Sequence, residues 1–170
     1  PEKIYNICNY LLENKLCKKI GVSNWKTSRI EEINYISNVK KGTSIIQESQ
    51  IFLNFIKLSH LPYPNIHMIN YSDYTWYINH PEHKIQIYSV VCFLSELDNN
   101  PIHQNKIFKN LLDYICDITN ETKQNIMYII LSKCTGLNVE CIQGSTSPNH
   151  ILNQTKIDEI FVLINKKIPK

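Results

Sequence analysis

One histidine in the C-terminal part of the chain is well placed in the sequence to act as a general base. His150 follows Asn149, after a segment, Gly136–Gly144, that is predicted to contain a strand. A histidine can take the proton from a cysteine thiol and so generate a thiolate nucleophile. The chain has six cysteines, which form no CxxC pair: Cys8, Cys17, Cys92, Cys116, Cys134 and Cys141. These residue types allow cysteine–histidine chemistry, provided that the fold brings a thiol to His150.

Three short segments resemble the core of transglutaminase-like (papain-like) domains; they are GLNVECIQG at 136–144, NH at 149–150 and KID at 156–158. The resemblance covers residues 120–165 and implies a helix with a nucleophilic cysteine at its start, a strand, a second strand that begins with a histidine, and a hairpin. It also implies that His150 is the general base and that Asn165 orients the imidazole. Glu121 stands at the nucleophile position and cannot form a thiolate. The resemblance therefore implies the scaffold of a cysteine enzyme without an identified nucleophile.

Four aromatic residues in the middle of the chain form a second candidate site: Tyr74, Trp76, Tyr77 and Tyr88. The segments Tyr74–Ile78 and Lys84–Val91 are predicted to pair as a hairpin across Asn79–His83. Alternate residues of a strand share a face, so the side chains of Tyr74 and Trp76 would lie side by side. Such a face suits a protein-binding hot spot or, less well without interleaved Lys or Arg, the stacking of nucleic-acid bases. Packing between the two strands is the structural alternative.

No residue pattern predicts a metal or a cofactor. His80 and His83, in Asn-His-Pro-Glu-His, could supply two of the ligands that zinc needs, but a solvated turn explains this segment better. The chain has neither a P-loop nor a Rossmann glycine pattern, and with only four glycines a phosphate-cradling loop is not expected. We therefore expect no cofactor and no metal site.

Size and composition predict a single compact domain. The chain has 170 residues, of which 43% are hydrophobic and 19% charged, so it can bury a core. The net charge of +3 is low for a dedicated nucleic-acid binder, and we expect a protein partner instead. No apolar run reaches the roughly 20 residues of a membrane span. The cysteine pattern suits a reducing compartment, cytoplasmic or nuclear, and the excess of Ile, Asn, Lys and Tyr is typical of an A/T-rich genome such as that of a virus or a parasite.

Hydrophobic periodicity predicts both helices and strands. Helices are expected at Glu2–Lys18, Ser28–Ile36, Ser44–Leu58, Ile107–Asp117 and Glu121–Cys134. Besides the aromatic hairpin, strands are expected at Asn65–Asn70, Val139–Ile142, Ile151–Thr155 and Ile160–Ile164. The order helix, strand, hairpin occurs twice, so residues 1–91 and 101–165 are possible duplicated halves of one domain, 1–165, which a basic tail, 166–170, follows. We expect an α+β fold in which helices pack on an antiparallel sheet.

The missing nucleophile and the aromatic segment together favour a non-catalytic protein-interaction module that binds its partner through the aromatic hairpin. A cysteine-dependent hydrolase or acyltransferase of transglutaminase-like fold, with His150 as its base, is the first alternative. Weak binding of single-stranded nucleic acid is the second, and steep salt dependence of the affinity would reveal it.

Overall fold

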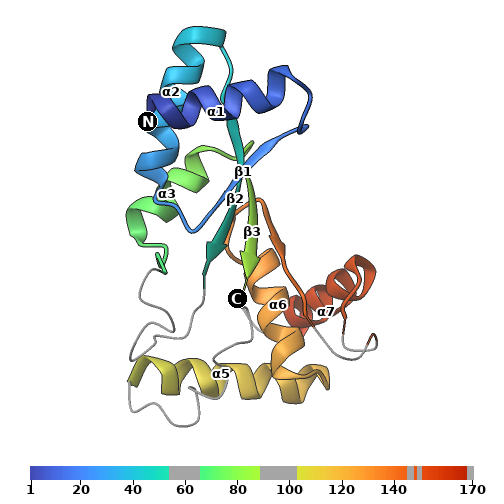
Figure 1. Ribbon diagram of the computed structural model, residues 1–170. Coiled ribbons are helices and arrows are strands. Elements are labelled where there is room, and N and C mark those ends of the chain that lie inside the picture. Colours follow the sequence, from blue (N-terminus) through green and yellow to red (C-terminus); the bar gives the residue numbers. More distant parts are fainter. Residues whose placement is uncertain (54–65, 89–102, 145–147, 149–150, 168–170) are drawn as a thin grey trace.

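The computed structural model describes residues 1–53, 66–88, 103–144, 148 and 151–167 (Figure 1). The helices are α1 (Glu2–Glu13), α2 (Thr27–Lys41), α3 (Tyr71–Asn79), α5 (His103–Thr119), α6 (Lys123–Lys133) and α7 (Gln154–Lys167). The strands are β1 (Ile20–Ser23), β2 (Ile46–Phe52), β3 (Lys84–Tyr88) and β4 (Val139–Cys141). Each pair of consecutive strands is thus separated by at least one helix.

These strands form one sheet in the order β1-β2-β3-β4, and every pairing is parallel. The predicted antiparallel sheet is therefore wrong, although the mixture of helices and strands is as predicted. Parallel neighbours need a crossover connection, which is usually helical. Here α2 joins β1 to β2, α3 joins β2 to β3, and α5 with α6 joins β3 to β4.

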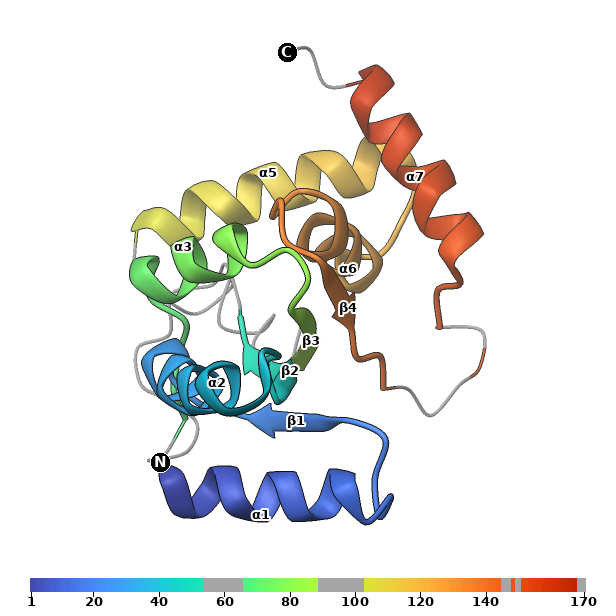
Figure 2. The ribbon, with the colours of Figure 1, turned by 90° about the horizontal axis from the view of Figure 1, so that it is seen from above.

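All of these connecting helices lie on the same side of the sheet (Figure 2). Crossovers between parallel strands are almost always right-handed, and this chain advances in one direction across the sheet, from β1 to β4. Connections of one hand that advance in one direction must all pass over the same face. The opposite face of the sheet therefore receives no layer from these helices.

The covered face of the sheet carries the main hydrophobic core. On β3 the side chains of Ile85 and Ile87 are buried, whereas those of Lys84, Gln86 and Tyr88 are only partly buried. The buried isoleucines pack with residues of α3, α5, α6 and α7. The alternation that the sequence shows in this segment is thus confirmed as a strand with one buried face, but its neighbours run parallel to it.

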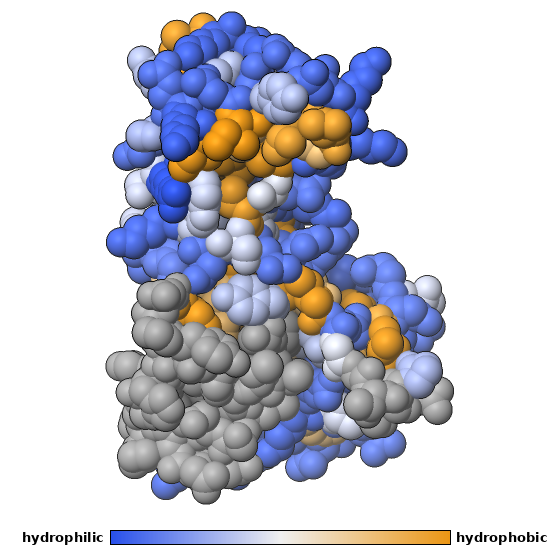
Figure 3. Space-filling view, viewed as in Figure 1, coloured by the Kyte–Doolittle hydropathy of each residue, from blue (hydrophilic) through white to orange (hydrophobic). Residues whose placement is uncertain are grey.

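A second cluster joins α1 and α2 to the start of β2; its buried members are Tyr5, Cys8, Ile30, Ile33, Ile45 and Ile46. The helix predicted at Glu2–Lys18 is confirmed, although it ends at Glu13. Its apolar stripe is only partly used in the core, because Ile7 is 54% exposed. In Figure 3 a band of apolar surface accordingly lies near α1.

The predicted helices Ser28–Ile36, Ile107–Asp117 and Glu121–Cys134 are confirmed as α2, α5 and α6, and the predicted strand Val139–Ile142 is confirmed as β4. The Gly42 backbone has φ = 70° and ends α2 in the left-handed conformation that glycine adopts without strain. Among the described residues, no helix combines the length and the apolar character that a membrane crossing requires.

The helix predicted at Ser44–Leu58 is wrong in its described part, because Ile46–Phe52 is β2. Its apolar residues cover most of a helical cylinder, but they also suit a central strand between two parallel neighbours. A short apolar run cannot be assigned to helix or strand by periodicity alone. The described part of the predicted strand Asn65–Asn70 is not a strand. Its Met68 makes only an isolated bridge with Phe52.

Both predicted hairpins are wrong, because each contains a helix. The first contains α3, which begins with a capping box in which Asn70 and Asp73 each accept a hydrogen bond from the backbone N–H of the other. The second is largely α7, whose buried residues have the spacing of one helix face: Ile157, Ile160 and Ile164. The segments expected to present aromatic residues and to hold the orienting Asn165 are therefore helical.

Candidate functional site

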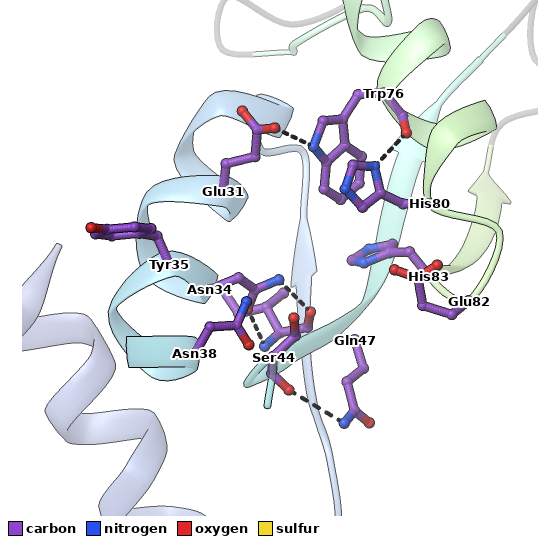
Figure 4. Close-up of a pocket in the computed structure, with 11 residues that line it drawn as sticks. Glu31, Asn34, Tyr35, Asn38, Ser44, Gln47, Trp76, His80, Glu82 and His83 are labelled. Atoms are coloured by element: carbon purple, nitrogen blue, oxygen red, sulfur yellow. Dashed lines mark hydrogen bonds between the residues drawn. The ribbon is translucent and has the colours of Figure 1, made fainter. Parts of the chain in front are cut away.

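A pocket of about 550 Å³ opens between α2, the start of β2, the end of α3 and the turn that precedes β3 (Figure 4). Its walls combine carboxylates, aromatic rings and uncharged polar groups. One of its lining residues is Trp76, which the sequence predicts to bind a partner. The pocket is therefore the candidate functional site.

Asn34 fastens α2 to the first residue of β2 and so sets the width of the pocket. Its side-chain amide donates to the carbonyl oxygen of Ile46 at 2.9 Å and accepts from the Ile46 backbone N–H at 2.8 Å. Both residues are buried, and buried backbone groups need such partners. The distance between the helix wall and the strand wall is thus fixed by one short side chain.

The end of α3 supplies an aromatic wall. The rings of Trp76 and His80 stack with 4.1 Å between their centroids and 18° between their planes. They are four residues apart, which brings them together on one side of the helix end, and His80 Nδ1 donates to the Trp76 carbonyl oxygen at 2.7 Å. The indole N–H of Trp76 donates to the Glu31 carboxylate of α2 at 2.7 Å. The Trp76 ring is therefore held in one orientation.

His83 completes this wall as a neutral group. It is 4% exposed, its Nε2 lies 2.8 Å from the Ser49 hydroxyl oxygen, and its ring meets the Trp76 ring edge-on. Burial lowers the pKa of His83 to about 4, and the neighbouring Glu82 carboxylate only partly opposes this effect. His83 therefore contributes no positive charge to the pocket at neutral pH.

The charge of the pocket is negative. Glu31 lies at the Trp76 end of the pocket and Glu82 at the His83 end, and both are exposed (Figure 4). No lysine or arginine is among the described residues that line it. Apart from the two glutamates, its polar side chains are amides, hydroxyls, the Trp76 indole and the two histidines. A cationic group that enters would meet carboxylates and aromatic rings, both of which attract it.

The predicted aromatic binding residues do not share one surface. Trp76 lines the pocket, whereas Tyr77 is 2% exposed and lies in the core. The Tyr74 hydroxyl donates to the carbonyl oxygen of Thr135, and Tyr88 lies on β3. The reason is the helical state of α3, because neighbouring residues of a helix point in different directions, whereas alternate residues of a strand share one.

The hydroxyl group of Tyr77 is buried and makes no hydrogen bond with the described residues. Burial raises the pKa of Tyr77, and the nearby Ser49 opposes this in part. The Ser49 hydroxyl is engaged with His83 instead. An unpartnered buried hydroxyl costs about 1–3 kcal/mol of stability.

The residues of the predicted cysteine–histidine site are not brought together in the described structure. His150 lies outside the described residues. Asn165 is exposed on α7, and the Glu121 carboxylate accepts a hydrogen bond from the Asn125 side chain just before α6. The hairpin on which the resemblance places Asn165 is a helix, so the transglutaminase-like assignment stays a prediction without that element.

Four of the described thiols lack the environment of an activated nucleophile. Burial raises the pKa of the thiol in each of Cys8, Cys116, Cys134 and Cys141. The pKa of Cys141 rises to about 12. A cysteine nucleophile needs a lowered pKa, usually from a helix N-terminus or a neighbouring cation. Cys92 lies outside the described residues.

A second polar cluster lies at the start of α2. One Asp73 oxygen accepts hydrogen bonds from the Thr27 backbone N–H at 3.1 Å and hydroxyl at 2.7 Å, and the other lies 2.7 Å from His67 Nε2. Burial raises the pKa of Asp73, but these hydrogen bonds outweigh it and the pKa is lowered. The carboxylate therefore stays charged at neutral pH and stabilises the positive end of α2. Among the described residues, no group of three or more His, Cys, Asp or Glu could hold a metal ion.

The sequence does not predict Glu31 and Glu82 as site residues. Glu31 stands in a capping-box pattern with Ser28 and so reads as part of a helix start, but its carboxylate binds Trp76, which is 45 residues away. Glu82 stands in a predicted turn with no feature that marks it. A capping box predicts a contact within its own helix. The contact between Glu31 and Trp76 instead depends on the packing of α2 against α3, which no local pattern indicates.

The described residues form a small domain with a parallel sheet, a layer of connecting helices on one face of it and an acidic, aromatic pocket. No protein-family model, curated protein or solved structure matches the chain. The function is therefore argued from the geometry and charge of the pocket.

Proposed function

We propose that this protein is a non-catalytic protein-interaction module whose pocket between α2 and α3 binds a basic side chain of a protein partner. The observation that carries the proposal is the composition of the walls. Glu31 and Glu82 flank the stacked rings of Trp76 and His80, and no lysine or arginine is among the described lining residues. Of the four aromatic residues that the sequence predicts to bind a partner, we retain Trp76 alone. It binds from the end of a helix and not from a hairpin.

A lysine or arginine side chain suits this arrangement. It carries its charge on a long apolar stem, so the stem can lie against rings while the charged group reaches a carboxylate. The protein itself has a net charge of +3, so its overall field repels a basic peptide. Any attraction for such a peptide must therefore come from a local acidic site.

Hydrogen bonds within the protein fix the walls of the pocket in the absence of a ligand. The Asn34 amide fixes α2 against β2, and the Glu31–Trp76 hydrogen bond fixes the indole ring. Because these side chains are already ordered, binding costs less conformational entropy than it would for free side chains. Preorganisation of this kind favours a binding role for the pocket.

Isothermal titration calorimetry with two peptides tests the proposal. One hexapeptide alternates lysine and glycine, and the other alternates glutamate and glycine. We expect the protein to bind the lysine peptide and not the glutamate peptide. The double variant Glu31→Gln, Glu82→Gln loses two exposed charge interactions of up to about 1 kcal/mol each, so its affinity should fall roughly tenfold.

The matched control is Glu32→Gln, which removes the same charge from the next residue of α2. Glu32 is exposed and does not line the pocket, so this variant should bind as the wild type does. Equal binding of both peptides, or full affinity of the double variant, would refute the proposal. Butylammonium ion as a competitor separates two sources of the cation: if it displaces the peptide at equal concentration, the ligand is a small amine and not a protein.

A further inference from the structure

The middle of the sheet face that points away from the connecting helices is polar. Further along the same face Phe52 is buried, and its ring meets that of Tyr88 edge-on. On the two central strands, Glu48 and Gln50 of β2 and Lys84 and Gln86 of β3 are only partly buried. They alternate with the residues of the covered face, which are Ser49, Ile51, Ile85 and Ile87. All-parallel sheets occur almost only with both faces covered. In the part of the chain that the structure describes, no helix of the connecting layer covers these four polar side chains.

The polar residues on this face lie in register across β2 and β3. Glu48 is paired with Lys84, and Gln50 with Gln86. Side chains from outside this pair extend the charged row. Lys19 Nζ lies 2.9 Å from Glu48 Oε1, and Glu140 Oε1 of β4 lies 2.9 Å from Lys84 Nζ. From the β1 side to the β4 side, the row therefore reads positive, negative, positive, negative.

A row of this kind is complementary to itself about one particular two-fold axis. The axis runs along the strands, midway between β2 and β3, in the plane where two facing sheets would meet. It turns the row end for end, so Glu48 of one copy stands opposite Lys84 of the second copy. Each charge meets its opposite because the row has an even number of alternating signs. A two-fold interface requires this self-complementarity.

The neighbouring row of amides obeys the same symmetry. About this axis Gln50 of one copy stands opposite Gln86 of the second copy. The Gln50 side-chain oxygen accepts from the Ser23 hydroxyl at 3.1 Å, and no hydrogen bond joins the Gln86 amide to the described residues. A side-chain amide has both donors and an acceptor, so two facing amides can satisfy each other.

The desolvation that such an interface requires is limited by the structure of a single copy. Glu48 and Lys84 are already partly buried, and each has an opposite charge at hydrogen-bond distance within its own chain. A charge that enters an interface with a partner already in place loses less than an unpaired one does. Covering this face therefore costs less than covering a face with unpaired charges would.

We infer that the polar face of the sheet is a homodimer interface, in which a second copy of this chain covers it about an axis parallel to the strands. The inference does not depend on the proposed function. The pocket lies on the helical side of the sheet, among α2 and α3, so a dimer of this kind leaves it open.

Charge reversal tests the inference in a way that separates contacts between chains from contacts within one. Glu48→Lys and Lys84→Glu each place like charges opposite each other in the dimer, so each variant should associate at least about tenfold more weakly than the wild type. An equal mixture of the two variants restores both opposite-charge contacts between chains. Sedimentation equilibrium should show a dimer for the wild type and for the mixture, and monomers for each variant alone.

The mixture does not repair any contact within a chain, so its recovery identifies the intermolecular pair. Gln86→Arg is a second variant, which adds bulk and charge at the centre of the face and removes no hydrogen bond to the described residues; it should also be monomeric. Glu159→Lys reverses an exposed charge on α7 and should leave the dimer intact. A wild type that stays monomeric at every concentration, a mixture that fails to associate, or equal loss of association in Glu159→Lys overturns the inference.

Discussion

The acid stability of the protein should depend on His83. This side chain is 4% exposed and lies between the Trp76 and Tyr77 rings and the Ser49 hydroxyl. Burial lowers its pKa from the ordinary 6.5 to about 4. The unfolded chain therefore binds a proton at His83 over a pH range in which the folded chain does not. The titratable groups that act on it, Glu82, His80 and Glu48, alter this shift but do not reverse it.

The sign and size of the effect follow from this difference in proton binding. At a pH above 6.5, His83 is neutral in both the folded and the unfolded chain and does not reduce the stability. As the pH drops from 6.5 towards 4, only the unfolded chain binds the proton, so the free energy of unfolding falls. Between pH 7 and pH 5 the loss due to this residue is about 2 kcal/mol, and it approaches about 3 kcal/mol at pH 4. Such a loss is a large fraction of the stability of a small domain.

Urea unfolding followed by tryptophan fluorescence measures this loss. Other groups of the protein also titrate in acid, so the test is the difference between the wild type and His83→Gln at each pH. Glutamine stays neutral and can still bond to Ser49, so we expect the variant to lack about 2 kcal/mol of the decline between pH 7 and pH 5. If the wild type and the variant lose equal stability over this range, the conclusion that His83 is buried in its neutral form is refuted.

Three further predictions concern residues around the core. Asp73→Asn should lower the free energy of unfolding by about 1–2 kcal/mol, because the amide caps Thr27 at the start of α2 less well than the carboxylate does; a urea midpoint equal to that of the wild type would contradict this. Tyr77→Phe should leave stability unchanged or raise it slightly, because its hydroxyl is buried without a partner among the described residues; a loss above about 1 kcal/mol in thermal melts would show that the hydroxyl is used. Cys141, whose pKa is raised to about 12, should resist iodoacetamide at pH 7 in the folded protein and react after unfolding. Mass spectrometry of the alkylated peptides checks this, and fast labelling of Cys141 below pH 7 would instead favour the cysteine-hydrolase alternative.

The sequence predicts the half-buried strand at Lys84–Tyr88 but not the direction of its neighbours. Alternation of apolar and polar residues is typical of an antiparallel sheet with one solvated face, because parallel sheets are normally covered on both. This sheet is parallel, yet Lys84, Gln86 and Tyr88 on one face of β3 are only partly buried, so the most common interpretation of the pattern is wrong. The connecting helices α2, α5 and α6 were nevertheless predictable, and helices between successive strands indicate parallel pairing.

Two helices were predicted as strands although the sequence contains their start signals. Asn70 and Asp73 form a capping box before α3, but the aromatic residues of that segment favour a strand by propensity. Asn153 accepts a hydrogen bond from the Lys156 backbone N–H at the start of α7. In both segments the polar cap outweighs the β-propensity of the residues that follow it.

The pocket is harder to predict than the elements that form it. Trp76 stands out by residue type, but the Glu31 carboxylate that binds it belongs to another helix, and their contact depends on the order of the strands. Glu82 and His83 occupy a turn whose polar residues have no distinctive spacing. Local patterns therefore indicate one wall of the site, and the packing of α2 against α3 supplies the other.

Chemical-shift mapping by NMR tests the binding role of the pocket most directly. The lysine–glycine hexapeptide is titrated into the isotope-labelled protein, and its fully acetylated form, which has the same length without the charges, serves as the control. We predict that the lysine peptide shifts the indole N–H of Trp76 and the backbone amides of Glu31, Asn38 and Glu82, and that the acetylated peptide leaves them unchanged. Shifts that gather elsewhere on the protein, or that are equal for both peptides, would contradict the proposal that this pocket binds a basic side chain.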